Sequence, residues 1–307
     1  MSLKVSEFWK LPMICWPSLK KIHWIGCLIT ETITSYASSQ PTLMRKLVRL
    51  IGSPLLAQWG KNMPESLSLL VVVFVIGILA GTAINAVVAW LPPYLYRQWE
   101  RDARDILGLS VDHPALPGFN NLHSAARRTL VVIACGLLSV GVVHHCGFTL
   151  EGLAFIVLTW SLIAASLVDA DHKILPDMIV LPLVWAGLIV NSFGFYTTSS
   201  AALWGAIGGY MSLWIVSWLF RLVAGKEGIG HGDFKLVSVF GAWGGWQVLP
   251  FTVFLAASLG VLVYSLTRFL SVRSTMDSAV VPFGPYISAA GWIVMLYSMN
   301  AVSLPLY

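Results

Sequence analysis

The chain has 307 residues, of which 57% are hydrophobic and only 11% are charged, and its mean hydropathy is +0.78. Because a soluble domain carries about 25% charged residues, this composition excludes a soluble globular protein and predicts an all-α, polytopic integral membrane protein. The net charge of +5 would suggest a nucleic-acid partner in a soluble chain, whereas here it indicates cationic loops on the cytoplasmic side of a bilayer. We therefore expect membrane lipid as a partner and no nucleic acid.

The first 65 residues carry eight Lys and Arg side chains and no apolar run long enough to span a membrane. The topology predicted below for the rest of the chain places the N-terminus outside the cell. Cations on an external N-terminus contradict the positive-inside rule. Either the segment folds back on the outer surface, or residues 22–37 cross despite His23 and Glu31. We therefore divide the chain into a basic N-terminal extension, residues 1–65, and a membrane domain, residues 66–307. As a hypothesis, translation begins at Met63, just before the first span, so that nearly all of the extension is not native. Mass spectrometry of the native N-terminus decides this, and a mature protein that begins at Met1 contradicts it.

The rest of the chain alternates between apolar segments and short polar loops, which predicts about eight transmembrane helices. We expect Pro92-Pro93 to end the first of them and residues 94–128 to form a polar loop. Five arginines place that loop in the cytoplasm. The predicted spans are 66–91, 129–150, 152–168, two within 178–220, 234–246, 249–270 and a last one that opens at 282–285.

Two polar motifs interrupt this apolar pattern, and both fall on the cytoplasmic side. The first is D-A-D-H-K-I-L-P-D at 169–177, and the second is K-E-G-I-G-H-G-D-F-K at 226–235. In the second motif three glycines alternate and lead to Asp233, which we expect at or near the N-terminus of a helix. The alternative interpretation is an ordinary connecting loop with an N-cap aspartate.

A pair of carboxylates at membrane depth has a specific chemical use. Ionisable groups in that position are costly and are therefore functional candidates. If Asp169 and Asp233 lie together, like charge raises the pKa of one of them, so that one carboxyl holds a proton while the other accepts one from water. This is what general acid–base hydrolysis of a peptide bond requires, without a metal or a covalent intermediate.

The two motifs resemble the two signatures of bacterial type IV prepilin peptidases, which are intramembrane aspartyl proteases of the G-x-G-D type. The segments at 81–92 and 282–286 are similar to the first and last spans of that family. The resemblance implies a helical bundle with a membrane-accessible cleft and places the catalytic pair on Asp169 and Asp233. It also implies supporting roles for the other motif residues, which are Asp171, Asp177, Gly228, Gly230, Gly232 and Lys235.

We give these supporting residues simpler roles from their positions. Asp177 follows Pro176 and can cap the next helix, while Asp171 can anchor the loop. Lys235 either tunes the pair of carboxylates or binds phospholipid headgroups, and the second role is the more general one for a lysine at a membrane boundary.

The resemblance implies an endopeptidase that cleaves the leader of type IV prepilins or type II secretion pseudopilins after a glycine. The reaction takes place at the cytoplasmic face of the bacterial inner membrane. The peptidase needs no cofactor, whereas a second activity, N-methylation of the new N-terminus, uses S-adenosyl-L-methionine. Many members carry two C-x-x-C pairs in the first cytoplasmic loop. Residues 92–128 contain no cysteine, so we expect no metal there and leave the methyltransferase activity open.

A secondary transporter or ion channel is the competing interpretation, with the two aspartates as proton or cation sites. Against it, both acids lie at one face rather than at the midplane, and the two halves of the chain show no repeated pattern. A structural scaffold whose acids only cap helices is a weaker alternative.

Overall fold

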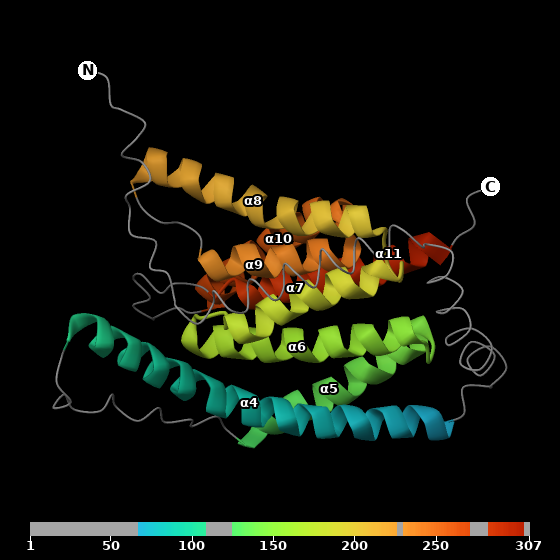
Figure 1. Ribbon diagram of the computed structural model, residues 1–307. Helices are drawn as coiled ribbons and strands as arrows, with labels where there is room; N and C mark the ends of the chain where they lie inside the picture. Colours follow the sequence, from blue (N-terminus) through green and yellow to red (C-terminus); the bar gives the residue numbers. More distant parts are fainter. Residues whose placement is uncertain (1–66, 109–124, 226–229, 271–281, 304–307) are drawn as a thin grey trace. The chain divides into compact units, whose positions relative to one another are not determined.

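The computed structural model of the chain describes residues 67–108, 125–225, 230–270 and 282–303. Within these ranges the chain forms eight α-helices and one short 3₁₀ helix, with no strand (Figure 1). The predicted basic extension, residues 109–124 of the first polar loop and Gly228 lie outside the described residues. The helices are α4 (Leu67–Leu107), α5 (Ala125–Cys146), α6 (Leu150–His172), α7 (Asp177–Ser192), α8 (Ser199–Ala224), α9 (His231–Gly244), η2 (Trp246–Val248), α10 (Leu249–Leu270) and α11 (Gly284–Ser303).

Each of the predicted spans corresponds to one of these α-helices, so the all-α membrane architecture is confirmed. Within the described ranges, five segments are long and apolar enough to cross a membrane, namely α4, α5, α6, α8 and the stretch formed by η2 with α10. Helix α7 is apolar but has only 16 residues. Helix α9 is shorter still, with 14 residues.

The prediction that Pro92-Pro93 ends the first span is wrong. Helix α4 continues through both prolines for more than three further turns, and Figure 1 shows that it changes direction along its length. Proline removes a backbone donor and displaces a carbonyl, which bends a helix without always ending it. Here Leu91 and Leu95 are buried on either side of the prolines, so packing holds both parts in helical form. Residues 94–107 are therefore helix rather than loop.

The hairpin between α5 and α6 turns slightly earlier than predicted. Its connection is formed by residues 147–149, and Thr149 is the N-cap, with Oγ1 accepting a hydrogen bond from Gly152 N at 3.0 Å. Glu151, where the turn was expected, lies in the first turn of α6. At its other end α6 runs past Asp169 to His172, because Lys173 takes the left-handed conformation that closes the helix.

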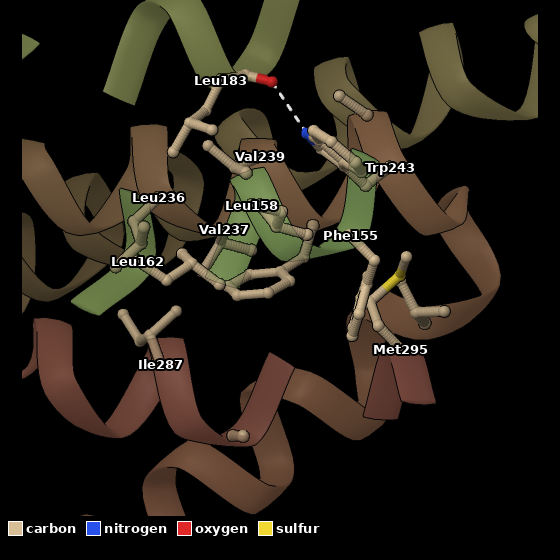
Figure 2. Close-up of a cluster of buried hydrophobic side chains, with 14 of the residues drawn as sticks. Phe155, Leu158, Leu162, Leu183, Leu236, Val237, Val239, Trp243, Ile287 and Met295 are labelled. Atoms are coloured by element: carbon tan, nitrogen blue, oxygen red, sulfur yellow. Dashed lines mark hydrogen bonds between the residues drawn. The ribbon is translucent and has the colours of Figure 1, made fainter. Parts of the chain in front are cut away.

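Helix α9 lies inside the bundle, packed against α7, α8, α10 and α11. Ten of its 14 residues are buried, so almost none of it can face lipid. Figure 2 shows part of the core around it, where Leu236, Val237 and Val239 lie among side chains of α6 and α11. Its contact with α8 is especially close, since a Cβ on Gly241 would overlap the carbonyl oxygen of Gly205.

Polar bonds to α7 close the C-terminal end of α9. The last carbonyls of any helix lack partners within the helix. In α9 two of them, on Ala242 and Trp243, accept hydrogen bonds from Nδ2 of the fully buried Asn191 at 2.8 and 2.7 Å. Trp243 Nε1 in turn donates to the carbonyl of Leu183 at 2.8 Å (Figure 2). These bonds fix the C-terminal end of α9 along the helix axis.

Candidate active site

Asp169 lies near the C-terminal end of α6 and is 6% exposed. Its Oδ2 accepts a hydrogen bond from the backbone N–H of Gly284 at 2.9 Å. Gly284 is the first residue of α11, so the carboxylate faces the end of a helix where free N–H groups and the dipole favour negative charge. The start of α11 therefore supports the ionised form of this side chain inside an apolar bundle.

Asp233 lies in the first turn of α9, as predicted, and is 9% exposed. Its backbone N–H donates to the carbonyl of Gly230 at 3.1 Å, which closes the turn at the start of the helix. Its carboxylate is close enough to Asp169 for the two charges to interact. The structure thus brings together the two aspartates that are separated by 64 positions in the chain.

The remaining acids of the first motif each pair with a cation from another helix. Asp171 Oδ1 lies 2.7 Å from Arg127 Nη1 of α5, so this residue anchors one helix to another rather than a loop. Asp177 Oδ1 accepts a hydrogen bond from Lys235 Nζ of α9 at 2.6 Å. The predicted N-cap role of Asp177 is wrong, because Pro176 occupies the N-cap position and Asp177 is the first helical residue.

The glycines of the second motif have separate positions. Gly230 is exposed and is the N-cap residue of α9, where it offers no side chain to cap the helix. Gly232 lies against the segment that follows α6, and a Cβ there would come 2.8 Å from Cβ of Leu175. A glycine at this position lets the first turn of α9 approach the first motif.

Gly284 is the site residue that the sequence did not reveal. The P-F-G-P-Y segment was expected to open the last span, as it does, but no role was assigned to its glycine. A Cβ at Gly284 would come 2.6 Å from Oδ2 of Asp169, which is too close for a side chain to fit without movement. The feature of the sequence that could have revealed Gly284 is a glycine between two prolines at the start of a helix.

The described residues offer little that could bind a metal ion or a methyl donor. Among them, no group of three or more His, Cys, Asp or Glu side chains is placed to bind a metal. A pocket of about 260 Å³ lies between α4, α5 and α6. Its charged groups are Arg127 and Arg128, and it contains no acidic or aromatic side chain. The pocket therefore has no carboxylate or aromatic ring to stabilise the sulfonium cation of S-adenosyl-L-methionine, and it does not fit this methyl donor.

Comparison with known proteins gives a consistent result. A model described as the type IV leader peptidase family matches residues 156–265, a range that includes both aspartates. Three curated relatives are each named prepilin leader peptidase/N-methyltransferase. The one from Stutzerimonas stutzeri is 41% identical over 73% of this chain and 89% of its own length. Those from Pseudomonas aeruginosa and Pseudomonas putida are 42% and 44% identical, over 72% and 73% of this chain and 88% of their own lengths. No solved structure matches the chain.

The contact between Gly284 and Asp169 gives a first prediction. Gly284→Ala should displace the Asp169 carboxylate and lower the rate of prepilin cleavage, the reaction in the relatives' names, by about a hundredfold, because small displacements of reacting groups have effects of that size. The rate is measured in membranes that contain equal amounts of each variant. Gly208→Ala in α8 is the matched control, since a Cβ there meets only ordinary contact at 3.8 Å. Equal rates for both variants would contradict the role of Gly284.

Proposed function

Because the chain belongs to the type IV leader peptidase family, we propose that Asp169 and Asp233 are the catalytic pair of an intramembrane aspartyl endopeptidase that removes the leader of prepilins or pseudopilins. The observation that carries this proposal is the placement of two buried carboxylates, from the end of α6 and the start of α9, within reach of each other's charge. Among the described residues, Asp169 and Asp233 are the acids whose side chains are buried.

The reaction that this pair supports is hydrolysis by general acid–base catalysis. Two carboxylates at short range do not both ionise readily, so one keeps a proton while its partner is a carboxylate. The carboxylate removes a proton from water as the water oxygen attacks the scissile carbonyl carbon, and the protonated partner donates its proton to the carbonyl oxygen. When the tetrahedral intermediate collapses, the C–N bond breaks and the leaving amine takes up a proton from the carboxyl that received one from water. At the same time one hydroxyl of the intermediate returns its proton to the partner carboxylate, which releases the new carboxyl end and restores the starting state of the pair.

The substrate is an apolar helix that carries a basic leader, cut after a glycine at the cytoplasmic boundary of the inner membrane. The family resemblance implies the leader and the glycine, and the position of the pair supports a cut near a membrane boundary, since Asp169 is within one turn of the end of α6 and Asp233 is the third residue of α9. Arg127, at the start of α5, and Arg221, at the end of α8, are the kind of cations that mark the cytoplasmic side. Type IV pili and type II secretion both supply substrates of this kind.

A transporter or channel is not favoured. The curated relatives are named as a peptidase and methyltransferase, and both aspartates lie at helix ends rather than halfway along a span. Acids that carry ions across a bilayer are instead expected near its midplane.

The second prediction tests the catalytic pair directly. Asp169→Asn and Asp233→Asn should each reduce leader removal by about 10²–10⁴-fold, the contribution typical of a general acid or base, because neither amide can exchange a proton in this way. Cleavage of a purified prepilin is followed by the mobility shift of the processed pilin. Asp105→Asn is the matched control, because Asp105 is an exposed acid on the part of α4 beyond the prolines. Cleavage that survives in either Asp169→Asn or Asp233→Asn would remove that residue from the catalytic pair.

We further propose that the chain N-methylates the processed pilin, with S-adenosyl-L-methionine as methyl donor. The acceptor nitrogen belongs to a peptide bond until the leader is removed, and an amide nitrogen is a poor nucleophile. Methylation of a prepilin therefore requires cleavage first. No role of an individual residue in this second reaction follows from the described part of the chain.

The third prediction concerns the order of these two reactions. Asp233→Asn should transfer no labelled methyl group to an intact prepilin, but it should methylate a pilin that already has its mature N-terminus at about the wild-type rate. Incorporation of label from S-adenosyl-L-methionine is measured for both substrates. Label on the intact prepilin, or none on the mature pilin with wild-type enzyme, would contradict the proposal.

A further inference from the structure

The ion pair between Lys235 of α9 and Asp177 of α7 lies beside the catalytic pair but takes no part in its chemistry. Lys235 Nζ lies 2.6 Å from Asp177 Oδ1, and the two side chains are 27% and 29% exposed. We propose that this α7–α9 ion pair is a positioning device that holds the first turn of α9, and with it Asp233, opposite Asp169. This inference rests on the catalytic roles proposed above.

Local helix electrostatics do not explain why a lysine stands at this position. Lys235 is the fifth residue of α9, near the end of the helix where the dipole disfavours a cation. Asp177 is the first residue of α7, where the dipole favours an anion. The Asp177 carboxylate is therefore stabilised by the dipole of α7 and by Lys235. The charge of Lys235 is stabilised by Asp177 but not by the dipole of α9. Its position is best explained by a function that joins the two helices.

Asp233 and Lys235 leave α9 on opposite sides of the helix. Asp233 and Lys235 are two residues apart, which corresponds to about 200° around an α-helix. One side chain thus leaves α9 towards α6, and the other leaves it towards α7. The residue between them, Phe234, is fully buried and contacts Tyr210 of α8, with ring centroids 6.0 Å apart. Any rotation of this turn that moves Asp233 must also break the ion pair or displace Phe234.

This turn needs tertiary support because its local supports are weak. The first N–H groups of a helix have no partners within the helix. The N-cap residue, Gly230, supplies no side-chain acceptor. The opposite end of α9 is fixed by Asn191, but the first turn lies a full helix length away from that bond. The contact with Asp177 is the ion pair that restrains this end among the described residues.

The experiment compares prepilin cleavage by five forms of the full chain in the same lipid. These are the wild type, Lys235→Met, Asp177→Asn, the double variant and Lys235→Arg. If the pair positions Asp233, each single change should lower kcat about tenfold and leave KM within about twofold, because the loss is one of geometry rather than of substrate binding. The double variant should be no slower than the slower single variant, because removal of either partner already breaks the pair. Lys235→Arg should keep kcat within about threefold of the wild type, since arginine can also pair with Asp177.

The following results would overturn the inference, as would normal kcat in both single variants. Losses that multiply to about a hundredfold in the double variant would mean that Lys235 and Asp177 act independently. A raised KM with unchanged kcat would mean that Lys235 binds the substrate. An effect of Lys235→Met that disappears in vesicles of zwitterionic lipid would mean that the lysine binds anionic headgroups instead. Lys173→Met is the matched control, because Lys173 is an exposed lysine of the neighbouring motif, and it should leave kcat unchanged.

Two further controls keep the outcomes distinct. If Lys235→Met does not accumulate in the membrane, Asp177→Asn tests the same contact with a side chain of nearly unchanged shape. Asp233→Asn is assayed beside these variants. A wild type that does not cleave prepilin would contradict the proposed function, whereas normal kcat in both Lys235→Met and Asp177→Asn, with an inactive Asp233→Asn, would contradict the positioning role alone.

Discussion

The burial of α9 is the constraint on which the rest of the structure depends. A helix enclosed by four others can approach them only where side chains are small, and the contact between Gly205 and Gly241 shows how little space separates α8 from α9. Asn191 then fixes the C-terminal end of α9 through two of its free carbonyls. Because an α-helix rises about 1.5 Å per residue, a fixed far end determines the depth of Asp233. The depth of one candidate catalytic carboxylate thus depends on packing at the opposite end of its helix, whereas the rotation of its turn depends on contacts near that turn.

The charges around the site divide into two kinds. Asp171 and Asp177 each face a cation from another helix, Arg127 or Lys235. Among the described residues, Asp169 and Asp233 have no cation within ion-pair distance, and each instead lies close to the other. Through these contacts Asp171 joins α6 to α5, and Asp177 joins α7 to α9. The acids that bind helices together are therefore separate from the acids that are free to exchange a proton with water.

The sequence predicted the order of the helices and both catalytic candidates, because these depend on local features such as apolar runs and polar motifs at their ends. It failed where the outcome depends on contacts between distant residues. The bend of α4 was misread as an end, because the packing of Leu91 and Leu95 overrides the local effect of two prolines. Gly284 was missed because its partner, Asp169, is 115 positions away. The role of Lys235 was left open for the same reason, since Asp177 lies 58 positions earlier.

The short length of α9 explains why polar groups are needed at both of its ends. Its 14 residues rise about 21 Å, less than the hydrocarbon core of about 30 Å, so at least one end lies at a depth where lipid offers no hydrogen bonds. Backbone groups at such a depth must find partners within the protein. Asn191 supplies them at the C-terminal end, and the segment from Gly230 to Lys235 brings its own polar groups to the other end. A short helix enclosed by others therefore places polar groups at its two ends inside the protein, and the hydrolysis proposed for Asp169 and Asp233 needs such polar surroundings.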